Sequence, residues 1–164
     1  MSDDGLLEAA RQYSRQLLNF FRRQGVSPSE AEDLLQETYL RLWKYRHRYE
    51  PKAKLSTFLF ILARQVRLDA FRNSARRAAR EESWGDADRM RRSCKRLDPC
   101  VREDVEWALS RLPDAMRETV ELVVFQDMRY ADAAKVLGVP PGTVKSRVFN
   151  ALKKLKEIFD ERRS

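Results

Sequence analysis

Few side chains in this sequence of 164 residues could carry out covalent or metal chemistry. There is one histidine, His47, and there are two cysteines, Cys94 and Cys100. A zinc site needs three or four nitrogen or sulfur ligands in fixed geometry, and a Cys-x5-Cys pair with no histidine nearby does not supply them. No candidate nucleophile lies beside His47, and the glycines are too scattered to form a phosphate-binding loop. We therefore expect a protein that is not an enzyme and has no metal or cofactor; the thiols are either reduced bystanders or a redox- or metal-sensing pair.

Basic and aromatic side chains are interleaved between residues 56 and 77. Arg64, Arg67 and Arg72 alternate there with apolar residues that include Phe71. This combination is typical of single-stranded DNA binding, because the cations neutralise phosphates while unstacked bases lie on the rings. A solvated basic face over a plain aromatic core would give the same pattern, so both interpretations stay open.

A second cluster of polar and basic groups falls on a helix expected to begin at Pro141. The helix before it carries Ala134, small enough for a close helix crossing, and Gly138 permits the positive φ of a tight turn between the two. This pattern predicts a helix-turn-helix with a recognition helix at its end, and a helical hairpin that does not bind DNA is the alternative. The outward face of the last helix presents Thr143, Lys145, Ser146, Arg147, Phe149, Asn150 and Lys153.

The net charge of +8 is concentrated in two segments. Residues 51–80 hold eight Lys or Arg against one acidic residue, and residues 128–164 hold nine against four. Residues 1–50 are neutral, with eight of each sign. The charge therefore predicts two separate contacts with a polyanion, and it leaves the first 50 residues for a protein partner.

Composition narrows the class of protein further. With 43% hydrophobic residues, the chain is too apolar for a disordered polycation. No apolar run approaches the roughly 20 residues of a membrane span, and the acidic start lacks the regions of a signal peptide. We expect a cytoplasmic protein without membrane insertion.

Apolar periodicity predicts helices throughout and almost no strand. In the first half of the chain, helices are expected over residues 6–24, from Pro28 onward with Ser27 as the N-cap, and over 56–77. In the second half, a short apolar stripe ends at Leu112, and helices are expected over 114–126 and from 141 to about 159. The fold class is therefore all-α, with two small helical domains at residues 1–80 and 103–164. They are joined by a flexible linker at residues 81–102, which contains Gly85 and Pro99 and has no sustained apolar period. The residues expected to be buried in the helix over residues 114–126 are Met116, Val120, Val123 and Val124. Those expected to be buried in the helix from Pro141 are Val144, Val148, Ala151, Leu152, Leu155 and Phe159.

The second helix has more apolar surface than one core stripe requires. Its expected core positions are Ala31, Leu34, Leu35, Thr38 and Leu42. Tyr39, Leu40 and Trp43 lie largely off that stripe, among polar residues. They indicate either a wider core face or a surface that binds a protein partner.

Two separate motif sets resemble the bacterial sigma factors of the extracytoplasmic-function (ECF, group 4) type in the sigma-70 family. The segment Tyr130-x3-Ala134-x2-Leu137-Gly138-Val139-Pro140-x-Gly142-Thr143-Val144-Lys145-Ser146-Arg147 resembles sigma region 4. Residues 31–43 (AEDLLQETYLRLW) resemble region 2.2, and residues 54–64 (KLSTFLFILAR) with Asp69 and Arg72 resemble regions 2.3 and 2.4. The sets come in the right order and are separated by a short linker.

This resemblance implies a transcription initiation factor that binds core RNA polymerase. The β′ coiled coil and the β flap would be its contacts on the polymerase, promoter DNA its second partner, and an anti-sigma protein its inhibitor. The linker would run toward the RNA exit, and the protein would be nucleoid-associated. The residues implied to contact the coiled coil are Asp33, Gln36, Glu37, Leu40 and Trp43.

The resemblance also implies two promoter contacts. The residues implied for the melted minus-10 element are Phe58, Phe60, Arg64, Gln65, Arg67 and Arg72. Many relatives have Trp in place of Phe58 and Asn in place of Gln65, at or near the pocket for a flipped base.

The recognition helix is implied to read the minus-35 element as duplex DNA. Asn150 replaces a common Arg there, which removes a phosphate or guanine contact and permits adenine readout. The implied contacts are Thr143, Lys145, Ser146, Arg147, Phe149 and Asn150.

Two other functions compete with this one. An autonomous helix-turn-helix regulator would use only the C-terminal domain and would leave the second helix unexplained. A degenerate sigma-like protein that titrates an anti-sigma factor is the other alternative, and the intact basic segments argue against it.

Overall fold

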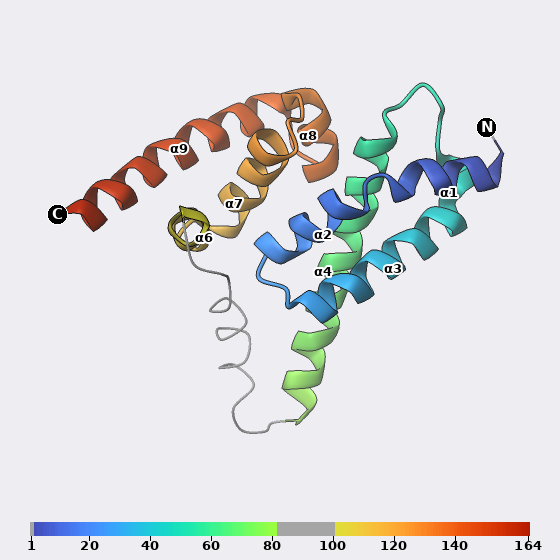
Figure 1. Ribbon diagram of the computed structural model, residues 1–164, viewed down its shortest axis with the longest axis horizontal. Coiled ribbons are helices and arrows are strands. Elements are labelled where there is room, and N and C mark those ends of the chain that lie inside the picture. The colour runs from blue at the N-terminus through green and yellow to red at the C-terminus, as the bar shows by residue number, and fades with distance from the viewer. Residues whose placement is uncertain (1, 82–100) are drawn as a thin grey trace. The chain divides into compact units, whose positions relative to one another are not determined.

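The computed structural model of the chain describes residues 2–81 and 101–164 (Figure 1). The chain divides into two units between Ser93 and Cys94. Cys94, Cys100 and most of the predicted linker lie outside the described residues. Every element in the described parts is a helix, which confirms the all-α prediction.

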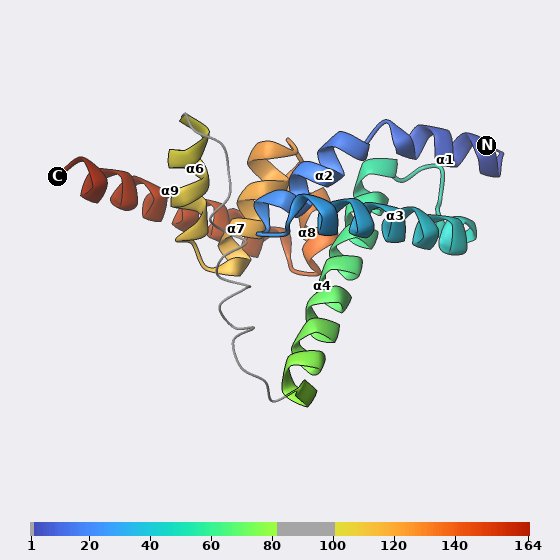
Figure 2. The ribbon, with the colours of Figure 1, turned by 60° about the horizontal axis from the view of Figure 1, so that its bottom comes forward.

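Over residues 2–81, the first unit consists of four α-helices and one short 3-10 turn. Helix α3 lies beside α4 and is covered at its ends by α1 and α2, as both ribbon views show (Figures 1 and 2). The elements are α1 (Asp3–Arg11), α2 (Ser14–Arg23), α3 (Pro28–Tyr45), η1 (Arg46–Arg48) and α4 (Leu55–Glu81).

The prediction of one helix over residues 6–24 was wrong, because the helix is interrupted between Arg11 and Ser14. Tyr13, the residue before α2, has φ −93° and ψ 2°, outside the helical region. The Ser14 hydroxyl donates a hydrogen bond to the Arg11 carbonyl at 2.7 Å and shares another with the Tyr39 hydroxyl of α3. Such local bonds compete with helix continuation, and the break turns the apolar faces of both helices toward the core.

Helix α3 begins with the predicted capping box. The Glu30 amide donates to the Ser27 hydroxyl at 3.3 Å, and the Ser27 amide donates back to the Glu30 carboxylate at 3.4 Å. Pro28 follows at the first helical position, where its missing N–H has no cost.

The core of the first unit is aromatic and aliphatic. Phe20 packs edge-on against Phe21 and Phe60, with ring centroids 5.5 and 5.4 Å apart. Leu6 and Ala10 of α1 join Leu42 in a neighbouring cluster. Along α3, Ala31, Leu35, Thr38 and Leu42 are buried as expected, and Leu34 is half-buried.

Helix α4 starts inside this core and extends beyond the other helices of its unit (Figures 1 and 2). Its first half buries Leu59, Leu62, Ala63 and Val66. Every side chain from residue 71 to residue 80 is exposed. The helix therefore has a packed half and a half whose side chains meet solvent.

The second unit is built around a long C-terminal helix. Helix α9 packs against α7 and α8, and Leu109, Leu112, Val120 and Ala151 form a core cluster. The elements are α6 (Val101–Ser110), α7 (Asp114–Val120), the π-helical turn η3 (Glu121–Phe125), α8 (Tyr130–Leu137) and α9 (Pro141–Arg163).

The π-helical turn changes which side chains face the core. A π turn holds more residues than an α turn, so the apolar phase shifts after Val120. Leu122 is fully buried, whereas Val124 is 52% exposed, and the prediction that Val124 is buried was wrong. Glu121 also turns inward, and its carboxylate accepts a hydrogen bond from the Gln126 amide at 3.0 Å.

The helix-turn-helix forms as predicted from the sequence between Tyr130 and the start of α9. Gly138 adopts φ +67°, and its amide and that of Val139 both donate to the Ala134 carbonyl, at 2.8 and 3.2 Å. This left-handed residue ends α8, and Pro141 opens α9 one turn later. Leu152, expected in the core of α9, is 51% exposed.

Candidate functional site

Helix α3 presents a continuous exposed face, which we call the docking face and define as Asp33, Gln36, Glu37, Leu40 and Trp43. The spacing of three or four residues places these side chains in one row along the helix. All five are exposed, and Leu40 is 65% and Trp43 41% exposed. The wider-core interpretation is therefore wrong for Leu40 and Trp43. It holds for Tyr39, which is half-buried and packs against the cluster around Leu42.

An ion-pair network anchors one edge of the docking face to α4. The Arg41 guanidinium contacts the Glu37 carboxylate at 3.3 Å and the Asp69 carboxylate at 2.8 Å. Burial alone would lower the pKa of Arg41, but hydrogen bonds to Asp69 and Glu37 together raise that pKa above its ordinary value. Arg41 is thus a fixed cation that joins the two helices.

The second surface runs along α4 and is called the strand face. Gln65 and Arg72 are exposed and lie seven residues apart on one side of the helix, in line with half-buried Phe58. Arg64 and Arg67 are half-buried and lie two turns and one turn before Phe71, respectively. The strand face comprises Phe58, Arg64, Gln65, Arg67, Phe71 and Arg72.

The structure corrects one residue of the predicted minus-10 set. Phe60 is 1% exposed and packs edge-on against Phe20, so neither face of its ring is open to a base. Phe71 is 57% exposed in the basic half of α4, so its ring is open where that of Phe60 is not. Helical phase does not separate the two rings, because Phe60 lies four residues before Arg64 and shares its side of α4. Packing against Phe20 is what buries Phe60.

The third surface is the N-terminal part of α9, called the reading face. Lys145, Ser146, Phe149 and Asn150 line a shallow open depression, and Phe149 is 70% exposed. Thr143 and Arg147 flank it and are half-buried. The Ser146 hydroxyl donates to the Gly142 carbonyl at 3.1 Å, so its oxygen is left to accept a further bond. All six predicted residues thus lie on one stretch of helix.

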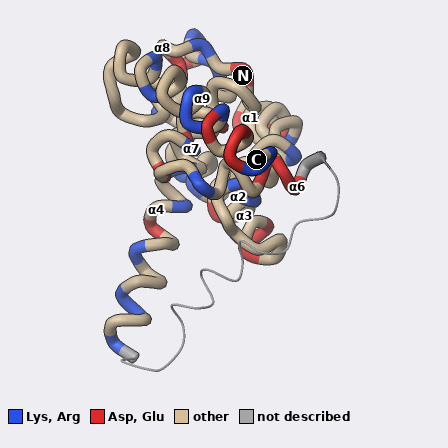
Figure 3. Tube along the Cα trace, turned by 90° about the vertical axis from the view of Figure 1, so that its left-hand side faces the viewer, with Lys and Arg blue, Asp and Glu red and all other residues tan. Residues whose placement is uncertain are grey.

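Lys and Arg residues recur along α4 and α9, as the blue positions of the tube show (Figure 3). On α4 the exposed cations Arg72, Arg76, Arg77 and Arg80 follow the packed half. The strand face and the reading face therefore both coincide with a basic segment of the sequence. The docking face, in contrast, carries the carboxylates of Asp33 and Glu37.

The described parts of the chain show no group of three His, Cys, Asp or Glu side chains arranged to hold a metal ion. Among the same residues, no helix combines the length and the apolar composition that crossing a bilayer requires.

Two family models match most of the chain. The model for sigma-70 region 2 matches residues 9–77, and the model for sigma-70 region 4 matches residues 102–155. The first contains the docking and strand faces, and the second contains the reading face.

Individual relatives agree with these models. The chain is 28% identical over 159 residues to the ECF RNA polymerase sigma factor RpoE of Cereibacter sphaeroides, covering 92% of this chain and 83% of the relative. It is 34% identical over 134 residues to the ECF RNA polymerase sigma factor EcfG of Rhodopseudomonas palustris, covering 79% and 71%.

A solved structure shares the fold. It is the sigma factor RpoE from Bartonella quintana in complex with the anti-sigma factor NepR, with a TM-score of 0.77 and 24% identity over 93% of this chain and 95% of that chain. The matched models, the relatives and the motifs on the described helices lead to one conclusion: this chain belongs to the family of ECF RNA polymerase sigma factors.

Proposed function

We propose that the chain binds core RNA polymerase through the docking face and directs initiation at promoters with specific minus-10 and minus-35 elements. The observation that carries this proposal is the exposed pair Leu40 and Trp43 on the otherwise polar face of α3. Exposed aromatic and aliphatic groups in a polar rim are typical of protein-binding surfaces. The same unit also bears the strand face. A subunit that brings polymerase to DNA needs both a polymerase contact and a DNA contact.

The polymerase contact combines an apolar centre with a charged edge. Leu40 and Trp43 would bury apolar surface against the β′ coiled coil, while Asp33 and Glu37 would favour basic side chains on it. Arg41 holds Glu37 at a fixed place on this edge through their 3.3 Å contact. The residue types thus fit a partner surface that is apolar in the middle and basic around it.

The strand face suits a melted minus-10 element. Arg72 is 69% exposed in its side chain and can meet phosphate, and the exposed ring of Phe71 can stack on an unpaired base. Gln65 can donate and accept hydrogen bonds at a base edge. We assign the binding of single-stranded DNA to this combination of cations, one amide and one open ring.

The reading face suits a duplex minus-35 element. A recognition helix meets base edges in the major groove with its N-terminal residues, and Lys145, Ser146 and Asn150 lie in that part of α9. Asn reads adenine through two hydrogen bonds, and an aromatic ring such as that of Phe149 can contact a thymine methyl group. Through promoter DNA the protein would be associated with the nucleoid.

An anti-sigma protein is a second proposed partner. The structurally similar sigma factor RpoE from Bartonella quintana was solved in complex with the anti-sigma factor NepR. CnrH, also similar in fold, was solved with the cytosolic domain of CnrY. We extend this mode of control to the present chain, with the β flap as a further contact on the polymerase itself.

The test is co-elution with purified core polymerase, followed by transcription from promoters mapped after overexpression. Replacing both Leu40 and Trp43 by Ala should weaken core binding by roughly 30-fold or more, because exposed apolar anchors are often interface hot spots worth about 2 kcal/mol or more. Helicity of the free protein should stay near wild type, since neither side chain is in the core. Val124→Ala is the matched control, because Val124 is 52% exposed and outside all three faces.

Three outcomes would contradict the proposal. Failure of the wild-type chain to bind core polymerase at moderate salt excludes the function itself. Duplex binding by the chain alone, unchanged by polymerase, supports the autonomous regulator. Loss of helicity in the double variant would mean that Leu40 and Trp43 act in the core.

A further inference from the structure

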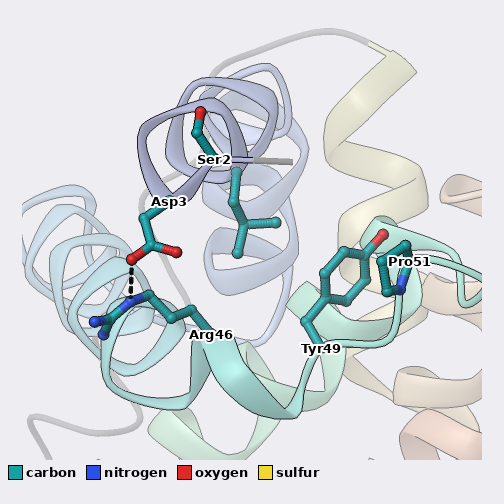
Figure 4. A pocket seen from close by; sticks show the side chains of 6 residues that line it. Ser2, Asp3, Arg46, Tyr49 and Pro51 are labelled. Atoms are coloured by element: carbon teal, nitrogen blue, oxygen red, sulfur yellow. Dashed lines mark hydrogen bonds and ion pairs between the residues drawn. The ribbon is translucent and has the colours of Figure 1, made fainter.

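The Arg46 side chain lies at the junction of α1, α3 and η1, directly after the docking face. Its Nε donates to the Asp3 carboxylate at 2.7 Å (Figure 4), and its Nη1 donates to the Trp43 carbonyl at 2.7 Å. Two bonds from one planar guanidinium fix both the position and the tilt of that plane. Arg46 is therefore held from α1 on one side and from the end of α3 on the other.

The fixed guanidinium stacks on the indole ring of Trp43. The Arg46 Cζ atom lies 4.2 Å from the ring centroid, within the range of a cation–π contact. Trp43 still has 41% of its surface exposed. One face of the indole is therefore covered by Arg46, and Trp43 remains partly open to solvent in a defined orientation.

Core packing holds Asp3 at this place. Asp3 precedes Leu6 by three residues, so the two share one side of α1. Leu6 is buried in the cluster that contains Leu42, and the Ser2 hydroxyl caps the helix by accepting from the Gly5 amide at 3.3 Å. A nine-residue helix is marginal alone, so this packing is what brings the carboxylate to Arg46.

We propose that Asp3 and Arg46 are positioning residues that hold the Trp43 indole in the orientation in which polymerase meets it. The inference rests on the proposed docking of polymerase at Leu40 and Trp43. Neither Asp3 nor Arg46 needs to touch the polymerase. The N-terminal helix α1 thus contributes to polymerase affinity through an Asp3–Arg46–Trp43 stack.

Pre-orientation is the physical reason for the effect. An exposed indole that rotates freely must be ordered at binding, and this ordering costs free energy that a fixed ring does not require. The carboxylate of Asp3 also neutralises Arg46, so the stack does not add an uncompensated cation beside Trp43. The docking face keeps its apolar centre and its acidic edge.

The first test uses the free protein and does not depend on polymerase. With Trp84 and Trp107 replaced by Phe, the fluorescence reports Trp43 alone. Asp3→Asn and Arg46→Ala should each shift the emission maximum to the red and increase quenching by acrylamide. Arg48→Ala is the matched control, because Arg48 stacks on Tyr45 at 4.8 Å and not on Trp43. Spectra unchanged in the Asp3 and Arg46 variants would overturn the proposed stack.

The second test is a double-mutant cycle on the affinity for core polymerase. Asp3→Asn should weaken binding by about 2- to 5-fold, as expected for a partly exposed ion pair, and Arg46→Ala by about 5-fold. Asp4→Asn, which removes the same charge from the same turn, should have no effect. In a Trp43→Ala background, both losses should disappear, because there is no ring left to orient.

The outcomes separate this inference from the docking proposal. If Trp43→Ala leaves affinity unchanged, the docking proposal itself is wrong. If Trp43→Ala weakens binding but Asp3→Asn and Arg46→Ala do not, docking stands and positioning is wrong. Equal losses from Arg46→Ala with and without Trp43 would mean that Arg46 contacts polymerase directly. Arg46→Lys, which keeps the charge but not the planar stack, should show most of the loss of Arg46→Ala.

Discussion

Arg147 flanks the reading face, half-buried at the N-terminal end of α9. An Arg at this place in a recognition helix can bind guanine through two parallel hydrogen bonds. We predict that Arg147→Ala weakens promoter binding by about 1–3 kcal/mol and relaxes the choice of base at one position. Binding of the polymerase complex to a set of minus-35 variants would measure both effects.

The control for Arg147 lies on the same helix. Lys156 is exposed on α9, nine residues further on and outside the reading face, so Lys156→Ala should leave base choice unaltered. An equal loss on every DNA sequence in Arg147→Ala would identify a phosphate contact and would exclude base readout.

Among single residues, polar surroundings were a better guide to exposure than residue type. Leu40 and Trp43 lie among polar residues, which left two interpretations open, a wider core face or a surface that binds a partner. The structure exposes both side chains. The sequence could not assign Phe60 in the same way, because half-buried and buried aromatics alternate in the first half of α4. Its burial depends on contact with Phe20, which comes from a helix 40 residues earlier.

At the scale of elements, the turn before α9 depends on one glycine. Gly138 has φ +67°, and a Cβ atom added to it would meet open space. A side chain at this position would therefore not clash with other residues, but it would be held in an unfavourable backbone conformation. We predict that Gly138→Ala lowers the free energy of unfolding by roughly 1 kcal/mol, the usual backbone cost of a left-handed residue. Chemical denaturation followed by circular dichroism would measure it.

Gly142 provides the opposite comparison within the same motif. It lies in the first turn of α9, with no positive φ and open space where a Cβ atom would lie. Gly142→Ala should therefore stabilise the protein by about 0.5–1 kcal/mol, because Ala loses less backbone entropy in a helix. A loss of stability of equal size in both variants would show that space and not backbone conformation limits the turn.

The helices were predictable where local signals agreed with packing. Ser27, Pro28 and Glu30 indicated the start of α3, and Gly138 indicated the end of α8. The break at Tyr13 was not predictable, since Ala10, Leu17 and Phe20 continue an apolar pattern across it. The π-helical turn after Val120 was not predictable either, because the packing of Glu121 and Leu122 in the core overrides the α-helical period of the sequence.

For the whole molecule, the distribution of charge along the chain agrees with the placement of the three faces. Both matched families describe transcription initiation factors, and neither is a catalytic family. The basic segments lie on α4 and α9, where the two DNA contacts are proposed (Figure 3). Promoter affinity of the polymerase complex should accordingly depend steeply on salt.

Arg76 and Arg77 test this dependence, because both are exposed in the second half of α4. Replacing both by Ala should lower the slope of log affinity against log salt by about 2, without changing promoter choice. Arg11→Ala with Arg15→Ala removes the same charge from exposed positions of the neutral first segment and should leave the slope unaltered. A shift in promoter choice in the Arg76 and Arg77 variant would indicate base contacts instead.

The solvent-facing half of α4 also has a thermodynamic consequence. Arg72, Arg76 and Arg80 follow one another at intervals of four residues, and like charges at this spacing destabilise a helix by about 0.2–0.5 kcal/mol per pair. Since every side chain from residue 71 to residue 80 is exposed, the helix–coil equilibrium there is set by its own sequence, in which three alanines oppose the repulsion. A bound polyanion removes that repulsion. Under the proposed binding of melted DNA to α4, strand binding and helix formation are therefore linked, and the DNA would stabilise the same helix that presents the arginines to it.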